Sequence, residues 1–474
     1  MAKKLKHFDD CTVTHLHSTG DMVAQTPEGL KILVDGRSAL PGEILSANTG
    51  TRKRKGLYEA RDIQVTQPVP LRQKPFCRHF GYCGGCRWQL APYETQVQWK
   101  HHQLMKWITH ALPGIDLPIE EPLASPQWTE YRNKMEYSFS ARKWRTPEEM
   151  DLPNSEEEVS TNQALGLFVP GTPGKVLDIY DCSLQNSLGN ELRNGLREFA
   201  QTQGFEFFES RKCTGYLRTL VIRNSTQGQW LVMLITAYED PNREEQLRTY
   251  CQTQFPWITS FYIMTNPKPN DSYQDCIPRH QYGQQWITET LDGLEFHIGP
   301  LSFFQTNLYQ TPRLYQLVQE YAQIEPHHLV YDLYTGTGTI AAYLARMAMK
   351  VIGIEYVEEA TKAATRACRE NGLENTEFYA GDMKDLLTLE FFQTHGKPDV
   401  VVCDPPRAGI HPQVVENIIA AGPERIVYVS CNPQSLAKDL AVFHRAYDIT
   451  RLRSIDMAPQ TPHGEAVAQL TRRI

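Results

Sequence analysis

The sequence predicts an α/β protein: a Rossmann-like parallel sheet towards the C-terminus, preceded by a small β-barrel and a mixed α/β region. Two patterns carry this prediction. From about residue 326, apolar stretches alternate with helical stretches, the apolar ones being HLVYDLY, KVIGIEY, TEFYAGD, DVVVCDPP and RIVYVSC. Such alternation is typical of parallel strands joined by right-handed crossovers, with helices on both faces of the sheet. Before about residue 68, short runs alternate apolar and polar residues between Gly and Pro, which is typical of a barrel.

The N-terminal segment, residues 1–68, is predicted to be an OB-like barrel, and barrels of this type commonly present a face to oligonucleotides. Lys and Arg outnumber Asp and Glu over residues 1–75, and the basic run TRKRKG covers Thr51 to Gly56, although the formal net charge of the chain is -7. A local basic patch engages phosphates whatever the net charge. The breaker-rich TQPVPLRQKP, from Thr66 to Pro75, is expected to be a linker.

Residues 69–300 are predicted to form a central mixed α/β domain, and residues 301–474 the domain that contains the parallel sheet. Within the central range we expect a helix from Tyr93 to about Ala111, strands around YRNKMEYSFSARK, and a second α/β pattern from 190 to 300. The acidic, Pro-interrupted segment from Thr146 to Ser160 is expected to be a solvated loop.

Composition is that of an ordinary soluble protein of two to four domains, with 474 residues, 41% of them hydrophobic and 22% charged. No apolar run approaches a membrane span, and the charged start MAKKLKHFDD shows no secretory signal. We therefore expect a cytoplasmic protein with no membrane partner and, by default, a monomer. The chain has 11 cysteines, which in the cytoplasm favour metal binding or catalysis over disulfides.

A glycine-rich turn follows the first strand of the predicted sheet, in DLYTGTGTIAAYLA. Gly336 and Gly338 permit a tight turn and a close approach of a ligand to the backbone where a helix begins. A dinucleotide fingerprint would place a third glycine where Ala341 stands, although alanine is tolerated there. Glu355 ends the second strand at a suitable distance to bind ribose hydroxyls. These residues fit an NAD site and an S-adenosylmethionine site equally well.

Carboxylates end four successive strands of the predicted sheet: Asp332, Glu355, Asp382 and Asp404. Because ligands bind beyond the carboxyl ends of parallel strands, we expect these groups to line one edge of a crevice. Such an edge suits a cationic sulfonium and repels a pyrophosphate. It therefore favours methyl transfer from S-adenosylmethionine over an NAD-dependent oxidoreductase. The simpler alternative is that each carboxylate only caps the helix that follows it.

A cysteine ends the fifth strand, in RIVYVSCNPQSLAKDL, where Cys431 meets an Asn-Pro turn. A lone cysteine is most often part of the core, but this one lies on the predicted methyl-donor edge. The helix that opens at Pro433 is expected to lower the pKa of the thiol. A thiolate at this edge indicates a pyrimidine substrate, because C5 attacks a sulfonium methyl only after a nucleophile has added at C6.

That reaction also needs a base, which removes the proton from C5 after methyl transfer. The candidate is Glu465 in MAPQTPHGEAVAQL, with His463 two residues before it. On spacing alone, Glu465 could equally be a surface residue.

Three cysteines lie close together in CRHFGYCGGCRWQL, where Cys77, Cys83 and Cys86 form a C-x5-C-x2-C pattern. Thiols so closely spaced are typical of a metal site, and either tetrahedral zinc or a four-iron cluster needs a fourth ligand. Cys182 in KVLDIYDCSL is the best candidate, because the other cysteines lie inside apolar strands or helices. The spacing leaves zinc and iron–sulfur open.

Together these motifs resemble the RNA uracil-5-methyltransferase family, particularly its ribosomal-RNA branch, over nearly the whole chain. VSCNPQSLAKDL is similar to the family's nucleophile motif, with Cys431 in the attacking position. PQTPHGEAV resembles its base motif, which makes Glu465 the base, and CDPPRAG its substrate-and-cofactor loop, which makes Asp404 a catalytic carboxylate. LSFFQTN resembles a cofactor-contacting segment of the family, which implies a cofactor contact from Gln305 and places Phe303 near the target base. YRNKMEYSF is similar to the stretch that supplies an arginine to the target uracil, here Arg132.

The resemblance also implies the cofactors. S-adenosylmethionine would be bound by the residues at the family's cofactor positions, namely Gln305, Tyr334, Thr339, Glu355, Asp382 and Asp404. Family members with this cysteine pattern carry a [4Fe-4S] cluster, here held by Cys77, Cys83, Cys86 and Cys182. The barrel resembles the TRAM domain, and with the cluster it implies 23S ribosomal RNA as the partner. Two positions depart from the family pattern: Gln460 replaces a histidine, and Thr339-Ile340 replaces a polar or aromatic pair.

Two further functions compete with this one. An RNA cytosine-5-methyltransferase also uses a cysteine, but its signature includes a Pro-Cys pair after the fourth strand, whereas here Pro405-Pro406-Arg407 follows Asp404. A non-catalytic RNA-binding protein could keep the barrel and the cluster as a scaffold. It would have no reason to keep Cys431, Glu465 and four strand-end carboxylates.

Overall fold

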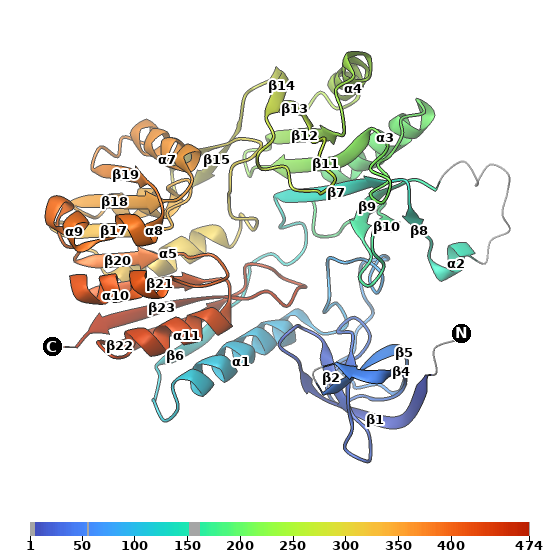
Figure 1. The fold of residues 1–474 in the computed structure, drawn as a ribbon, viewed down its shortest axis with the longest axis horizontal. Helices are drawn as coiled ribbons and strands as arrows, with labels where there is room; N and C mark the ends of the chain where they lie inside the picture. The colour runs from blue at the N-terminus through green and yellow to red at the C-terminus, as the bar shows by residue number, and fades with distance from the viewer. Residues whose placement is uncertain (1–4, 55, 151–161, 474) are drawn as a thin grey trace.

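The computed structural model describes residues 5–54, 56–150 and 162–473, which form a barrel, a central sheet and a C-terminal sheet (Figure 1). Lys55 of the basic run and residues 151–160 of the predicted acidic loop lie outside the described residues. No helix within the described ranges is long and apolar enough to cross a membrane.

The N-terminal strands close into a barrel, as predicted, and their order in it is β1-β2-β3-β5-β4. They are β1 (Lys6–Leu16), β2 (Met22–Gln25), β3 (Lys31–Val34), β4 (Ile44–Arg54) and β5 (Leu57–Gln67). Met22 and Leu45 are fully buried in its core, which Trp88 from the following segment also enters. The Trp88 indole Nε1 donates a hydrogen bond to Gly20 O at 2.9 Å. The barrel is therefore packed onto the chain that follows it.

The central region is an eight-stranded mixed sheet in the order β14-β13-β12-β11-β7-β9-β10-β8. Its strands are β7 (Lys134–Ser140), β8 (Lys143–Trp144), β9 (Ala164–Phe168), β10 (Val176–Asp178), β11 (Leu217–Asn224), β12 (Trp230–Thr236), β13 (Ser260–Thr265) and β14 (Pro278–Gly283). Three helices belong to this region, namely α2 (Pro147–Met150), α3 (Ser187–Thr202) and α4 (Pro241–Gln254). Leu196 of α3 and Leu247 of α4 share the apolar core of this sheet.

The C-terminal sheet contains the five predicted parallel strands in the order β19-β18-β17-β20-β21. They are β17 (Leu329–Leu333), β18 (Lys350–Glu355), β19 (Thr376–Ala380), β20 (Val400–Cys403) and β21 (Arg425–Ser430). Neighbouring residues of a strand face opposite sides of the sheet, and each side has its own core. Val330 packs in the core that contains helices α5–α7, and Tyr331 packs in the core that contains helices α8–α11. The helices are α5 (Thr311–Ala322), α6 (Thr339–Ala345), α7 (Glu358–Glu370), α8 (Met383–Leu386), α9 (Leu389–His395), α10 (Pro412–Ala421) and α11 (Pro433–Phe443).

Beyond β21 the sheet continues with strands that the strand–helix alternation does not predict. β23 (Glu465–Arg472) runs antiparallel between β21 and β22 (Tyr447–Ile455). Because Ala466 pairs with Ser430, the first residue of β23 lies at the edge where the parallel strands end. The antiparallel direction thus brings Glu465 to the end of β21.

Two segments of the predicted central range 69–300 join the C-terminal sheet instead. β6 (Ile119–Leu123) pairs with β22, with Leu452 opposite Ile119, and covers the outer edge of the sheet. α1 (Tyr93–Ala111) lies under this sheet (Figure 1) and shares a core with it through Leu104 and Ile108. The hairpin β15 (Ile287–Leu291) and β16 (Leu294–Ile298) also joins this half of the molecule. β6 thus covers the edge of β22, and α1 buries its apolar side chains in the core of the same sheet.

Candidate active site

A cavity of about 2070 Å³ opens at the carboxyl ends of the parallel strands, where ligands of such sheets bind. Nearly all the predicted catalytic, cofactor and substrate residues line it: Phe303, Gln305, Tyr334, Thr339, Glu355, Asp382, Asp404, Cys431 and Glu465. Residues from segments more than 100 positions apart are thereby brought to one site.

The glycine turn after β17 has the tight geometry that its sequence predicts. Gly338 has φ 77°, and a Cβ on it would lie 2.6 Å from Ala364 Cβ of α7. Only glycine fits there, because the turn needs both a left-handed backbone and close contact with a neighbouring helix. The Gly336 N–H donates to Glu355 Oε2 at 3.0 Å, so the turn and the end of β18 are joined.

Three of the four strand-end carboxylates line the cavity, but Asp332 does not. Asp332 is fully buried beneath the turn, where it accepts a hydrogen bond from the Thr335 hydroxyl. The prediction that all four line the crevice is therefore wrong, because Asp332 is the penultimate residue of β17 and faces inward. Asp382 has both of the roles considered for these carboxylates, helix capping and lining of the ligand site. It caps α8 by accepting a hydrogen bond from Lys384 N at 3.1 Å, and it lines the cavity.

Cys431 follows β21 at the start of a loop that is held by hydrogen bonds on both sides. The side chain of Asn432 caps α11 by accepting from Gln434 N at 3.1 Å, and its Nδ2 donates to Arg407 O at 2.8 Å. The thiol is half-buried. Burial, and then the carboxyls of Glu465 and Asp404, raise its pKa. The expectation that the helix start lowers this pKa is thus not met, because burial of the thiol and the two carboxyls outweigh the opposing effect of Arg407.

Glu465 and Asp404 are carboxyl groups whose ionisation is also suppressed. Burial, followed by the nearby charges of Asp404 and Asp456, raises the pKa of Glu465 to about 8. Burial raises the pKa of Asp404 to about 7. Perturbed carboxyls in a cleft beside a thiol are typical of a catalytic site.

Arg407 is a functional candidate that the motif analysis left without a role. It lines the cavity, and its charge opposes the effects that raise the pKa of Cys431 and Glu465. Its Nη2 lies 3.4 Å from His463 Nδ1. Partial burial and then Arg407 lower the pKa of His463 to about 4, which leaves that imidazole neutral. The signal in the sequence was the arginine that directly follows Asp404-Pro405-Pro406.

The four predicted metal ligands line a second cavity of about 390 Å³: Cys77, Cys83, Cys86 and Cys182. Burial, and then the nearby thiol of Cys182, raises the pKa of Cys86, and burial raises that of Cys83 to about 12. Thiols that are costly to ionise without a cation fit a site that binds metal. Arg132, predicted at the target uracil, lines this second cavity and not the main one. Its contact with the substrate stays a prediction.

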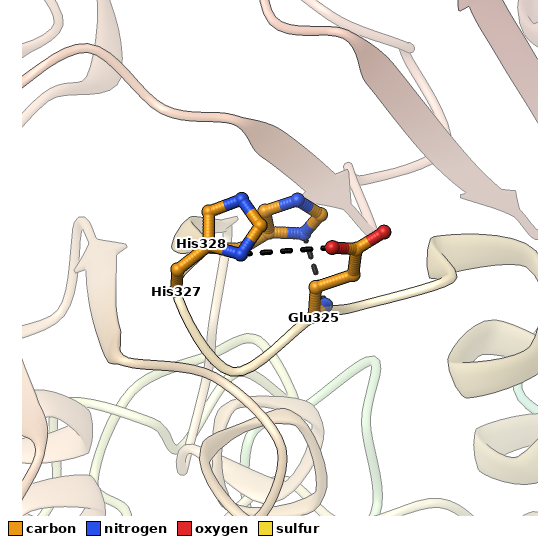
Figure 2. A group of neighbouring side chains, drawn as sticks. All are labelled: Glu325, His327 and His328. Carbon is orange, nitrogen blue, oxygen red and sulfur yellow. Dashed lines mark hydrogen bonds and ion pairs between the residues drawn. The ribbon is translucent and has the colours of Figure 1, made fainter.

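A different trio brings its ligand atoms within 4.8 Å of one another, namely Glu325, His327 and His328 (Figure 2). The four thiols do not form so tight a group among the described residues. In the trio, His328 Nδ1 accepts from Glu325 N at 3.0 Å and is occupied as part of the turn between α5 and β17. This group lies at the amino end of β17, away from the cavity that the strand ends line.

Comparison with known proteins agrees with this arrangement. The tRNA (Uracil-5-)-methyltransferase family profile matches residues 282–473. An uncharacterized RNA methyltransferase of Porphyromonas gingivalis is 41% identical over 439 residues, which cover 92% of this chain and 94% of that protein. Another, of Chlorobaculum tepidum, is 37% identical over 470 residues, 98% of this chain and 96% of that protein.

Among solved structures, the Pyrococcus abyssi tRNA (uracil-54, C5)-methyltransferase in complex with S-adenosyl-L-homocysteine is similar over 97% of this chain and 99% of that chain. The TM-score is 0.75 and the identity 26%. The fold and the site thus define an RNA methyltransferase that uses S-adenosylmethionine. More particularly, the chain belongs to the RNA uracil-5-methyltransferase family. The acidic strand ends fit this cofactor, which carries hydroxyl groups and positive charges.

Proposed function

We propose that this protein methylates C5 of a uridine in 23S ribosomal RNA, with Cys431 as nucleophile, Glu465 as base and Asp404 as a carboxylate at the reacting centre. One observation carries the proposal: these three side chains line one cavity, from the neighbouring ends of β20, β21 and β23. A cytosine-5-methyltransferase is disfavoured because Pro405-Pro406-Arg407 supplies no cysteine after β20. A non-catalytic scaffold would need neither the thiol nor the base.

The bound S-adenosylmethionine supplies an electrophilic methyl group. The thiolate of Cys431 adds to C6 of the uracil and shifts electron density to C5. C5 would then take the methyl group as the bond from this methyl to the donor sulfur breaks, which leaves S-adenosylhomocysteine. The Glu465 carboxylate removes the proton from C5, and the C6–S bond breaks to release the thiolate. Phe303 lines the cavity with 65% of its surface exposed, which leaves its ring free to stack on a base. Arg132 is proposed as a second contact to the uracil.

Cofactor binding is proposed for the cavity residues that the family pattern indicates: Gln305, Tyr334, Thr339, Glu355, Asp382 and Asp404. Glu355 is well placed for ribose hydroxyls, because it ends β18 beside the glycine turn. The carboxylates provide the negative charge that a sulfonium and an amino group require.

Ribosomal RNA is the proposed substrate, with transfer RNA as the alternative. The TRAM-like barrel and the four thiols support ribosomal RNA through the family resemblance. Transfer RNA is a second candidate, because the P. abyssi protein, which is described as a tRNA (uracil-54, C5)-methyltransferase, is similar over almost the full length of both chains. We place the protein in the cytoplasm as a monomer, where either RNA is available.

Mapping of 5-methyluridine at nucleotide resolution distinguishes these substrates. We expect cells without this protein to lose 5-methyluridine at one or more positions in 23S ribosomal RNA, and the protein to restore it. Loss confined to transfer RNA would overturn the ribosomal assignment and leave the chemistry intact. Unchanged 5-methyluridine in both RNAs would overturn the proposed function.

The four thiols are proposed to hold a [4Fe-4S] cluster. A tetrahedral zinc site, with Zn–S distances of about 2.3 Å, brings its sulfurs within about 3.8 Å of one another. The four cysteines do not form a group within 4.8 Å in the described part of the chain, yet they share one cavity of about 390 Å³. This wider arrangement supports a cluster.

Anaerobic purification tests the cluster. We expect a coloured protein with about four iron atoms and sulfide per chain, and we expect Cys86→Ser to lose the visible absorption. Cys213→Ser is the matched control, because Cys213 is exposed and does not line the cavity. A colourless protein with one zinc ion would contradict the iron assignment.

A further inference from the structure

One face of α1 holds the loop that leads into Glu465. Tyr93, Gln96 and Lys100 are spaced i, i+3 and i+7 on this helix, so they lie on one side of it, and all three are buried. A helical face that buries a tyrosine, a glutamine and a lysine is unusual, because polar side chains are buried only where they find partners. The hydrogen-bond partners of these three side chains lie between Asp456 and Gln460, apart from Ser125 and two backbone carbonyls near α1.

The contacts are direct. The Tyr93 hydroxyl donates to Asp456 Oδ2 at 3.0 Å. Gln96 Nε2 donates to Gln460 Oε1 at 3.0 Å, and Gln96 Oε1 accepts from Gln460 N at 3.1 Å. Lys100 Nζ donates to Asp456 Oδ1 at 2.6 Å and to Ala458 O at 2.9 Å. Gln460, the residue that departs from the family pattern, is thus matched to Gln96 by a reciprocal pair of hydrogen bonds.

The Lys100–Asp456 ion pair is almost completely removed from water, with side-chain exposures of 5% and 2%. A buried ion pair contributes little net stability, because desolvation of both charges offsets their attraction. The position of this ion pair beside the loop that leads into Glu465 therefore indicates its role better than its contribution to stability does. A Cβ on Gly464 would lie 3.5 Å from Lys100 Cβ, so the lysine stem lies against the residue that precedes Glu465.

Several ionisable groups act on Glu465 from the elements around it. Asp404 of the loop after β20 opposes its ionisation, as does Asp456 of the loop from Asp456 to Glu465, which we call the base loop. Lys100 of α1 and Arg407 favour its ionisation. Cys431 and Tyr315 are also within electrostatic reach, and His463 precedes Glu465 by two residues. Lys100 and Asp456 therefore act on Glu465 with opposite signs, in a region where water screens charges weakly.

We propose that Lys100 and Asp456 are positioning residues for the base: they hold the loop from Asp456 to Glu465 and set the pH at which the Glu465 carboxylate can remove the C5 proton. This inference rests on the proposed function, since it assigns a role relative to that base. Neither residue needs to touch the RNA or the methyl donor.

The test measures the base step alone. Single-turnover reactions of unmodified 23S ribosomal RNA and transfer RNA transcripts with S-adenosylmethionine and the full-length protein are run at a series of pH values. The formation and the loss of the protein–RNA band are followed at each pH on denaturing gels, and the rate of loss is fitted separately from the rate of formation. Cys431 is covalently occupied in this adduct and does not titrate, so the pH dependence of decay reports the base.

The two charges predict shifts in opposite directions. Lys100→Met removes a cation that favours the carboxylate, so the midpoint of the decay profile should rise by about one pH unit. Asp456→Asn removes an anion that opposes it, so the midpoint should fall by a similar amount. Gln96→Leu is the matched neutral control on the same helix face. It should slow decay by loosening the loop and leave the midpoint in place.

Lys100→Met leaves Asp456 buried without its partner and can fail to fold. A second comparison avoids this problem. The double variant Lys100→Met/Asp456→Leu replaces the pair by apolar groups, and its midpoint should lie above that of Asp456→Asn, because only the latter keeps the lysine charge.

Equal midpoints in these variants, or shifts in one direction only, would overturn this inference while the wild-type protein still forms and resolves its adduct. Absence of a Cys431 adduct and of methylation in the wild type, with either RNA, would instead overturn the proposed function and this inference with it.

Discussion

At the scale of single residues, the chemistry depends on how Cys431 is surrounded. The thiol is half-buried, burial and then the carboxyls of Glu465 and Asp404 raise its pKa, and the charge of Arg407 opposes this effect. In the protein without ligands, the thiolate is therefore costly to form. Positive charge from a bound sulfonium would favour ionisation of all three acids, so that the nucleophile becomes available when the methyl donor is present.

These raised pKa values predict an alkaline rate profile. The thiol and Glu465 must both be ionised for turnover, and groups with raised pKa values ionise only at higher pH, so kcat/KM should increase from pH 6 and still be increasing at pH 9. The free-enzyme profile of kcat/KM reports these groups. Arg407→Gln should move the midpoint to still higher pH. A profile that is flat between pH 6 and 9 would contradict this assignment.

At the scale of elements, two features position the site: the turn between β17 and α6, and the antiparallel strand β23. The turn brings α6 against α7 so closely that Gly338 has no room for a side chain. β23 lies between β21 and β22 and starts with Glu465 at the end of β21. The left-handed turn at Gly338 and the antiparallel direction of β23 each place cavity residues within a few positions of a strand end.

Gly338→Ala tests the turn. The substitution forces a left-handed alanine and a contact of 2.6 Å with Ala364 Cβ, and it should cost about 3 kcal/mol of unfolding free energy. It should also weaken S-adenosylmethionine binding, because Ala360 and Ala363 of α7 line the cavity. Calorimetric titration and denaturant unfolding measure both effects.

The control for this substitution is Gly372→Ala. Gly372 also has a left-handed backbone, φ 69°, but a Cβ there meets nothing within 4 Å. It should cost about 1 kcal/mol and leave cofactor binding unchanged. Equal effects of the two substitutions would show that the close approach of α6 to α7 is unimportant.

At the scale of the whole molecule, the three parts meet at the base loop. Arg87, next to Cys86, donates its N–H to Gln460 O at 2.8 Å and its Nη1 to Thr19 O of the barrel at 2.9 Å. A Cβ on Gly20 would lie 2.4 Å from Pro462 Cβ. Deletion of the barrel would therefore disturb the base loop. A deletion variant thus cannot show whether the barrel contributes to RNA binding or to the chemical steps.

Surface substitutions on the barrel can distinguish an effect on RNA binding from an effect on the chemical steps. Lys6 and Lys53 are exposed and lie 5.1 and 5.0 Å from the centre of the Tyr58 ring. If they contact phosphates, Lys6→Gln/Lys53→Gln should raise KM for RNA and reduce the slope of log KM against log salt by about two phosphate contacts. The maximal rate should not change. A lower kcat with an unchanged KM and salt slope would contradict an RNA-binding role.

Sequence patterns predict the parallel strands and the cavity residues because both follow from local periodicity and from the rule that ligands lie at strand ends. They do not predict that β6 pairs with β22, since Ile119 and Leu452 are distant in the chain. For the same reason the Lys100–Asp456 pair is not predicted. The burial of Asp332 and the raised pKa of the Cys431 thiol depend on side-chain directions that a strand-end motif does not specify.

Attack of Cys431 on the uracil and release of the product by Glu465 can be separated with the variant Glu465→Gln. With S-adenosylmethionine and unmodified 23S ribosomal RNA or transfer RNA transcripts, this variant should accumulate a covalent protein–RNA adduct, because the C5 proton cannot leave. Mass spectrometry of the digested band should find a methylated uracil attached to Cys431, and Cys431→Ser/Glu465→Gln should give no band. Turnover of Glu465→Gln at the wild-type rate without an adduct, or attachment to another residue, would contradict the account.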